Sequence, residues 1–260
     1  MTTLDVQLSP AWCTWQELRD ASLEAERMGF GALWVFDHLA GVALGGEAML
    51  ECFTLLGALA EATSTIELGS LVVNVWNRGV GTAVSAAASV ALVSGRPFHF
   101  GIGAGTSPRS PWATEQHAVG AELEPRIEDR HARVEALVDL ARRAWRPDRP
   151  AELTTFPLPT SAPSIVVGVN SDRLAALAGR IADGVNVPWH HPRRDELLAV
   201  AAGSAADAAR SIDRTVWTYY EPELLDPEHP ERLAMDALGL ARVVLVQLRA
   251  PDFSRSGRLG

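Results

Sequence analysis

The sequence predicts an α/β protein whose parallel strands close into a (β/α)8 TIM barrel. Short β-branched runs alternate with longer helical patterns from end to end, which is typical of a parallel sheet. The length of 260 residues also matches such a barrel. A doubly wound open sheet is the alternative, because periodicity alone does not decide whether the sheet closes. Eight strands are expected, at Leu4–Leu8, Ala32–Asp37, Ile66–Asn74, Phe98–Gly103, Ser164–Asn170, Gly184–Trp189, Thr215–Tyr220 and Arg242–Leu248.

Helical patterns fill the seven intervals between these strands. Apolar residues recur at i, i+3, i+4 and i+7 over residues 174–181, which gives one helix face that covers the sheet. The same spacing occurs over residues 134–141. Gly29, Gly95 and Gly184 stand at junctions between helix and strand, where we expect a left-handed residue to end each helix.

The chain is expected to form one domain over residues 1–260. The proline-rich segment Pro147–Pro163 is interpreted as a surface connection rather than a domain boundary. After Leu248 only a short polar tail remains, so the eighth helix of the barrel is expected to be reduced or missing. The apolar face that this would leave near the first and last strands predicts a homodimer.

The composition is that of a folded protein and argues against nucleic-acid and membrane partners. Apolar residues make up 47% of the chain, the net charge is -9, and all 23 basic residues are Arg without a dense cluster. The uncharged stretch Gly79–Gly95 is too short and too polar to span a bilayer and predicts a buried helix. Cys13 and Cys52 are too few for a disulfide scaffold, and no signal pattern opens the chain, so we expect a cytoplasmic protein.

Asp37 and His38 follow the apolar run of the second predicted strand. In a barrel of this kind, side chains at the carboxyl ends of the strands face the active site. An adjacent carboxylate and imidazole can donate and accept protons near neutral pH. The alternative is that Asp37 caps a turn and that His38 is merely solvated. The location at a strand end favours a catalytic pair.

Two residues after the third predicted strand have side chains suited to a cofactor. Trp76 can form a wall for a planar ring, and Arg78 can bind an anion. Packing of Trp76 into the core is an equally good interpretation, because large aromatic side chains usually fill cores.

The fourth predicted strand leads into Gly105, Thr106, Ser107 and Arg109. Glycine lets a ligand approach the backbone, and the residues after it supply hydroxyl groups and a cation. The run is similar to half of a dinucleotide-binding fingerprint, but the full glycine spacing is absent and this is not the first βα turn.

The fifth predicted strand leads into Gly168, Asn170 and Ser171 before a helix. The free amides of the first turn of that helix form an anion site, with Asn170 or Ser171 as the N-cap. Simple capping is the alternative, and Asp172 in the first turn favours it.

His190 and His191 after the sixth predicted strand raise the possibility of a metal-dependent hydrolase. Together with Asp37 and His38 they supply ligand types that zinc prefers. Such sites also draw ligands from other strand ends, and the first strand ends without a pair of histidines. A metal site is therefore the weaker hypothesis.

Taken in order, four segments resemble the luciferase-like monooxygenase superfamily. They are residues 25–39 with the Asp37 and His38 pair, residues 66–74, residues 94–105 with their glycines, and residues 168–184. Each motif alone is loose, but their order and spacing are specific. The resemblance covers most of the first 190 residues and is weak beyond them.

This resemblance implies a barrel that binds the deazaflavin coenzyme F420 or FMN at the carboxyl ends of its strands. It implies that His38 is the general acid or base and that Asp37 orients it. Asn74 and Val75 would lie behind the coenzyme ring, where the family often has a bulge with a non-prolyl cis peptide. The coenzyme tail would contact the loops Gly105–Ser107 and Gly168–Ser171, with Arg78, Arg109 or Arg173 as cations.

The expected activity is F420-dependent hydride transfer to or from a small organic substrate. An FMN-dependent monooxygenase and a catalytically silent cofactor-binding homologue are the alternatives. Thr106 stands where some F420-dependent relatives have an acidic residue, which leaves the identity of a second proton-transfer group open. The substrate-covering insertion of the family is expected to be reduced.

Overall fold

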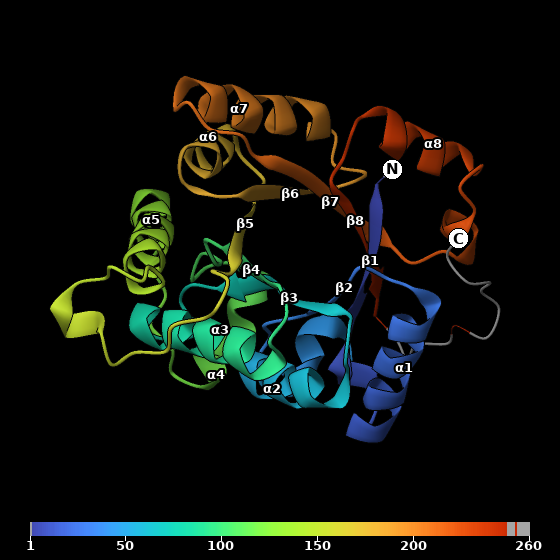
Figure 1. Ribbon diagram of the computed structural model, residues 1–260, viewed down its shortest axis with the longest axis horizontal. Coiled ribbons are helices and arrows are strands. Elements are labelled where there is room, and N and C mark those ends of the chain that lie inside the picture. Colours follow the sequence, from blue (N-terminus) through green and yellow to red (C-terminus); the bar gives the residue numbers. More distant parts are fainter. Residues whose placement is uncertain (1, 249–252, 254–260) are drawn as a thin grey trace.

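The computed structural model describes residues 2–248 and residue 253, and its eight parallel strands close into a barrel, as the sequence predicts (Figure 1). β1 pairs with β8 from Thr3 opposite Arg242 to Leu8 opposite Gln247, so the sheet has no free edge. The strands are β1 (Thr3–Leu8), β2 (Ala32–Val35), β3 (Glu67–Asn74), β4 (Phe98–Gly103), β5 (Ser164–Gly168), β6 (Gly184–Pro188), β7 (Asp213–Tyr219) and β8 (Arg242–Gln247).

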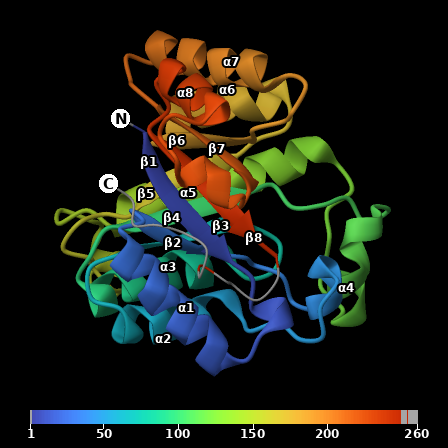
Figure 2. The same cartoon turned by 90° about the vertical axis from the view of Figure 1, so that its right-hand side faces the viewer.

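Helices surround this barrel (Figure 1), because each has an apolar face that packs on the outer side of the strands. They are α1 (Trp15–Met28), α2 (Cys52–Ala62), α3 (Val80–Ser94), α5 (Ile127–Ala144), α6 (Asp172–Ile181), α7 (Arg194–Asp207) and α8 (Pro230–Ala237), and α4 (Thr114–Ala118) is a further short helix. The sequence did not predict α4, which has only five residues and therefore no readable helical period. Figure 2 shows α4 at the edge of the molecule, apart from the helices that surround the barrel.

The ends of the helices follow ordinary capping chemistry. Thr14 and Glu17 form a capping box at the start of α1, and Gly29 ends that helix with a φ of 91°. Gly95 ends α3 in the same way, with a φ of 62°. The prediction for Gly184 was wrong, because this residue opens β6 instead of capping α6. A Cβ atom at Gly184 would lie 3.2 Å from the Val166 side chain, so its small size matters inside the barrel.

The reduced or missing eighth helix would follow β8, and this prediction lies outside the described residues apart from Phe253. Phe253 is buried, and its ring centroid lies 5.8 Å from that of Phe30 and 5.6 Å from that of Tyr220. Phe253 therefore packs against Phe30, just after the end of α1.

The barrel interior has its own cluster, separate from the core under the helices. Ala32, Trp34, Leu71, Val166 and Val244 form this inner cluster. Trp34 occupies the space that Gly69 leaves, because a Cβ atom at Gly69 would lie 2.6 Å from the indole. Trp34 also stacks on His99, with ring centroids 5.2 Å apart. These contacts fill the amino-terminal half of the barrel, as expected for packed barrel interiors.

A buried ionic network closes the same end of the barrel. Asp5 on β1 is fully buried and accepts bonds from Trp34 Nε1 at 2.9 Å and Arg242 at 3.0 and 3.2 Å. Arg242 on β8 also donates to Glu67 on β3, and Glu67 contacts His99 Nε2 at 2.8 Å. Four strands are thus joined by one set of charges.

None of the helices in the described part of the chain is long and apolar enough to cross a membrane. The uncharged stretch that the sequence analysis singled out forms α3.

Candidate active site at the carboxyl ends of the strands

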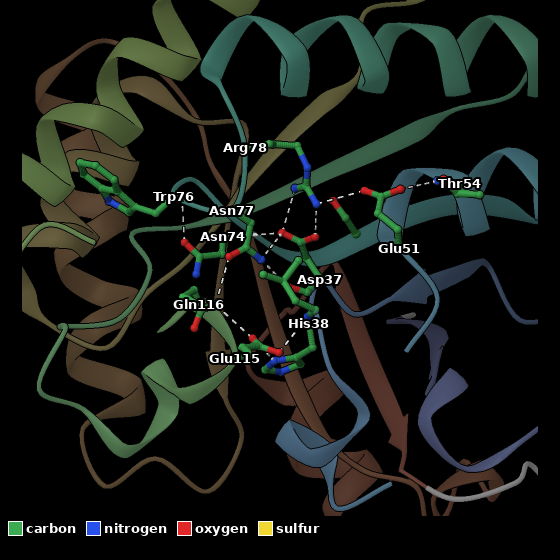
Figure 3. Close-up of polar contacts among 12 residues, drawn as sticks. Asp37, His38, Glu51, Thr54, Asn74, Trp76, Asn77, Arg78, Glu115 and Gln116 are labelled. Carbon is green, nitrogen blue, oxygen red and sulfur yellow. Dashed lines mark hydrogen bonds and ion pairs between the residues drawn. The ribbon is translucent and has the colours of Figure 1, made fainter. Parts of the chain in front are cut away.

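Asp37 lies just beyond β2 and binds the loop that follows β3 (Figure 3). Its carboxylate accepts two bonds from Arg78 and one, at 2.9 Å, from the backbone amide of Asn74. Asn77 Nδ2 donates to the Asp37 carbonyl oxygen at 2.9 Å. β2 ends at Val35, two residues earlier than predicted, because the pairing with β3 stops at Ser70, where β3 bulges. Asp37 therefore ties two loops together.

Arg78 is held by two carboxylates. It donates to Asp37 and, at 3.1 Å, to Glu51, whose own carboxylate caps the start of α2 through the amide of Thr54. The guanidinium also lies over the Phe53 ring, with its carbon 5.0 Å from the centroid. The sequence analysis expected Arg78 to bind an anion, but these contacts already neutralise it.

The buried charges explain the acidity of Asp37. Burial raises the pKa of its carboxyl above the ordinary value of 3.8, and the bonds from Arg78 and the Asn74 amide limit that rise. The same pairing raises the pKa of Arg78 despite the burial that acts against it. A closely paired arginine and carboxylate of this kind serve to position the loops.

His38 has a different carboxylate partner from the expected one. Its Nδ1 lies 2.9 Å from Glu115 Oε1, and the side chain of His38 is 32% exposed whereas that of Glu115 is only 3% exposed. Figure 3 shows Glu115 beside the imidazole and Asp37 directed toward Arg78. The role of Asp37 in orienting His38 is therefore corrected: Asp37 acts on the β3 loop, and Glu115 contacts the histidine.

Glu115 is also bonded to the backbone next to His38. Its Oε2 accepts from the amides of Leu39 at 2.8 Å and Ala40 at 3.0 Å. Burial acts to raise the pKa of Glu115, but the bonds from His38 and from these two amides outweigh it and hold this pKa below the ordinary value of 4.5. The carboxylate is therefore charged at neutral pH.

The end of β3 contains the predicted irregularity. The register with β4 shifts between Ser70 and Val73, and the peptide bond between Leu71 and Val72 is cis. The resemblance placed these features near Asn74 and Val75, and they occur a few residues earlier. The bulge turns Val72 inward, where it packs with Trp217 on the inner cluster and stays partly exposed.

Val75 and Trp76 lie away from this inner surface. Val75 is buried in the core under the helices, and its carbonyl accepts a bond from Arg133. Arg133 also covers the Trp76 ring, with its guanidinium carbon 4.4 Å from the centroid. Trp76 Nε1 is buried, and the described residues offer it no hydrogen-bond partner. The interpretation of Trp76 as a packed side chain therefore fits its position better than that of a ring wall.

Two residues of β3 lie against glycines at or just after the ends of β4 and β5, Asn74 against Gly105 and Val72 against Gly168. A Cβ atom at Gly105, which has a φ of 72°, would lie 2.5 Å from Asn74 Oδ1. A Cβ atom at Gly168 would lie 3.0 Å from Val72 Cγ1. The loops after β2, β3, β4 and β5 therefore meet at one end of the barrel. We call the region around Val72, Gly168 and Trp217, all partly exposed, the barrel mouth.

The loops after β4 and β5 offer polar groups near the mouth. Thr106 and Ser107 are partly exposed, and Arg109 is exposed. Asn170 is exposed as well, and Ser171 is the N-cap of α6 but makes no side-chain capping bond. The first-turn amides of α6 therefore lack the side-chain oxygen that usually satisfies one of them.

Arg173, the remaining cation of the sequence analysis, already has a carboxylate partner. Arg173 pairs with Glu128 at 2.8 Å on the surface. Asp172 in the first turn of α6 pairs with Arg193, which removes part of its competition with an incoming anion.

The described residues do not form the cluster of ligands that the metal hypothesis requires. Within residues 2–248 and residue 253, no group of three or more His, Cys, Asp or Glu side chains could hold a metal ion. His190 is exposed on the loop after β6, and His191 Nδ1 accepts a bond from the Arg193 amide.

The sequence analysis missed Glu115, Gln116, Asn77 and Glu51. Gln116 is buried and donates to Glu115 and to Asn77, both at 3.0 Å. Glu115 lies 77 residues from His38 along the chain, on a helix too short to be predicted. The sequence signal for Glu115 was an acidic residue in the segment after β4, and no repeating pattern around it distinguishes it from other acidic residues.

The fold and this site define a parallel barrel with a carboxylate-bound histidine at the carboxyl ends of its strands. Residues 2–219 match the luciferase-like monooxygenase family, which confirms the resemblance seen in the sequence. The chain belongs to this family.

The chain is similar to proteins that use F420. An F420-dependent glucose-6-phosphate dehydrogenase from Segniliparus rotundus is 28% identical over 180 residues, covering 65% of this chain and 52% of that protein. One from Nakamurella multipartita is 28% identical over 209 residues, covering 76% and 60%. The chain thus spans little more than half the length of these relatives.

Solved structures share the fold. An F420-dependent secondary alcohol dehydrogenase in complex with an F420-acetone adduct has a TM-score of 0.76 at 13% identity, covering 97% of this chain and 95% of that one. A monooxygenase from Streptomyces bottropensis has a TM-score of 0.71 at 18% identity, covering 99% and 96%. At these identities the similarity establishes the barrel alone.

Proposed function

We propose that this protein is an F420-dependent oxidoreductase that transfers hydride to or from a small organic substrate, with His38 as its general acid or base. The observation that carries the proposal is the partly exposed imidazole of His38, whose Nδ1 contacts the buried carboxylate of Glu115. An imidazole can both donate and accept a proton and is therefore suited to proton exchange with a substrate. The names of the sequence relatives support F420 as the coenzyme.

The polar groups around the mouth fit a ring with an anionic tail. Val72 and Trp217 offer an apolar surface for a planar ring. Thr106, Ser107 and Arg109, together with the uncapped first turn of α6, offer hydroxyl groups, a cation and free amides for phosphate. This donor set makes local anion binding favourable although the net charge of the chain is -9.

Each residue then has a limited task. The coenzyme, when bound, supplies the hydride chemistry, and the protein orients it and manages one proton. With Nδ1 held by Glu115, the proton exchanged with the substrate passes through Nε2 of His38. Asp37 keeps the loop after β3 in place through Arg78 and the Asn74 amide.

An FMN-dependent monooxygenase is the second candidate, because monooxygenases are among the proteins that share this fold. A cofactor-binding homologue without catalysis is the third. Titration with F420 and with FMN in separate experiments, followed by fluorescence, distinguishes them. Saturable binding of F420 alone supports the proposal, binding of FMN alone supports the second candidate, and tight binding without turnover supports the third.

The role of His38 is tested with the variant His38→Ala. If His38 exchanges the substrate proton, turnover falls by about 10²- to 10⁴-fold while coenzyme binding persists. The exposed His190 on the loop after β6 provides the control, and His190→Ala is expected to keep parental turnover. Parental turnover of His38→Ala would refute the assignment.

The cysteines agree with the proposed location in the cytoplasm. Cys13 and Cys52 are both free thiols, and Cys52 is buried. Burial raises the pKa of the Cys52 thiol well above its ordinary value, so it stays protonated and unreactive.

A further inference from the structure

Glu115 makes more hydrogen bonds than an anchor of a surface helix requires. Its Oε1 contacts His38 Nδ1 and accepts from Gln116 Nε2, and its Oε2 accepts from the amides of Leu39 and Ala40. Three of these four contacts are with consecutive residues, 38–40, in the loop that follows β2. The side chain of Glu115 is only 3% exposed, so water does not compete for these bonds.

The charge of Glu115 determines which nitrogen of His38 carries the proton. A carboxylate only accepts hydrogen bonds, so the nitrogen that faces it must donate. Nδ1 therefore carries a hydrogen atom, and in the neutral imidazole Nε2 is left with the lone pair. Within the described part of the chain, no hydrogen-bond partner is found for Nε2.

The backbone bonds of Glu115 fix the direction of the ring as well. Oε2 is held by the two amides that directly follow His38, so the carboxylate has a set position relative to the Cα atom of that residue. Gln116 adds a second attachment through Asn77 on the loop after β3. The short helix α4 thus has two adjacent buried side chains, Glu115 and Gln116, and its other three residues are exposed.

We propose that Glu115 is a positioning residue that fixes the Nδ1–H tautomer of His38 and leaves Nε2 for proton exchange with the substrate. This inference rests on the proposed function of His38. It assigns a role to the segment between β4 and α5, since a carboxylate from this segment completes a site that begins at β2.

The variant Glu115→Gln tests the tautomer. A glutamine offers one carbonyl oxygen and one NH2 group. The oxygen is needed by the two backbone amides, so the NH2 group faces Nδ1, which must then accept a bond. The proton of His38 is therefore expected to move to Nε2. The measurement is ¹⁵N NMR of the histidine side chains in the protein without coenzyme, with His38 assigned by its loss in His38→Gln.

The control is Glu122→Gln, because Glu122 is an exposed acid in the same segment. It is expected to keep the Nδ1–H tautomer of the parent. A parent protein with the proton on Nε2, or a Glu115→Gln variant with an unchanged His38 pattern, would overturn the proposal. The parent spectrum alone decides this if the variant does not fold.

Kinetics separate positioning from a merely structural role. In Glu115→Gln we expect kcat to fall by about 100-fold or more with little change in KM, because the wrong tautomer is presented. A purely structural role would leave the tautomer unchanged and reduce kcat only by the unfolded fraction. If the parent shows no F420-dependent activity, the proposed function fails, but the NMR result still judges Glu115 independently.

Discussion

Replacement of Arg242 by methionine would remove the arginine that joins Asp5 and Glu67 in the ionic network at the amino-terminal end of the barrel. Arg242 donates to Asp5 at 3.0 and 3.2 Å and also binds Glu67. The Asp5 side chain is 0% exposed, and among the described residues only Trp34 Nε1 would still donate to it after the replacement. Methionine retains much of the apolar volume of the arginine chain, so the change acts mainly on charge.

The cost follows from the burial of the two partners. Removal of one partner from a buried ion pair destabilises a protein by about 3–5 kcal/mol, because the other charge is left without compensation. The Arg242 side chain is 20% exposed, so water can enter and replace part of the lost interaction. We therefore expect a loss of about 3 kcal/mol in the free energy of unfolding, which corresponds to about 6–12 °C in Tm for a chain of this size.

The loss in the free energy of unfolding should become smaller as the pH falls. Burial already raises the pKa of Asp5 above its ordinary value of 3.8, and Arg242 opposes that rise. Without Arg242 the folded-state pKa rises further. A carboxyl whose pKa is higher in the folded than in the unfolded state binds more protons when folded, so its penalty decreases as pH falls through the folded-state pKa. The deficit of the variant should thus be smaller at about pH 5 than at about pH 7.5.

The assay is urea denaturation followed by circular dichroism, with parent and variant compared at both pH values. Arg146→Met is the control, because Arg146 and Asp148 form a surface pair with side chains 63% and 69% exposed, and no measurable loss is expected. A loss below about 1 kcal/mol for Arg242→Met, or an equal loss at both pH values, would refute the reasoning.

Two further predictions concern Gly105 and α3. Gly105→Ala should lower the free energy of unfolding by about 1–3 kcal/mol in urea denaturation, because Gly105 has a φ of 72° and the new Cβ atom would collide with Asn74. The control Gly120→Ala, with a φ of 67° and no atom near the new Cβ, should lower it by less. Equal losses in the two variants would contradict the role of the Asn74 contact. The predicted homodimer should show twice the chain mass in light scattering. The sequence analysis expected its interface near the first and last strands, and the structure offers α3 as a different candidate face, because α3 carries no charged residue and exposes Leu92 and Val93. Val93→Glu should then be monomeric, and a monomeric parent would end this prediction.

The strands could be predicted because apolar runs identify them, but their ends depend on neighbours. Phe98–Gly103 was predicted with both ends correct. The strand predicted to end at Asp37 stops at Val35, because its partner bulges after Ser70 and offers no further pairing. A bulge in one strand leaves no mark in the sequence of the next.

The site was predictable only where a rule about strand ends applies. That rule located Asp37 and His38 correctly beyond β2. It could not assign their partners, because Glu115 reaches His38 across 77 residues and Arg78 is neutralised by Asp37 and Glu51. Buried charges select partners in three dimensions, and a linear pattern does not record that selection.

The fit between Trp34 and Gly69 gives the barrel a floor. Trp34 is only 1% exposed and Asp5 is fully buried, so these side chains close the amino-terminal end of the barrel to solvent. Positions 34 and 69 are also coupled, because a methyl group at Gly69 would collide with the indole of Trp34. A larger residue at position 69 is therefore tolerated only after a smaller side chain has replaced Trp34.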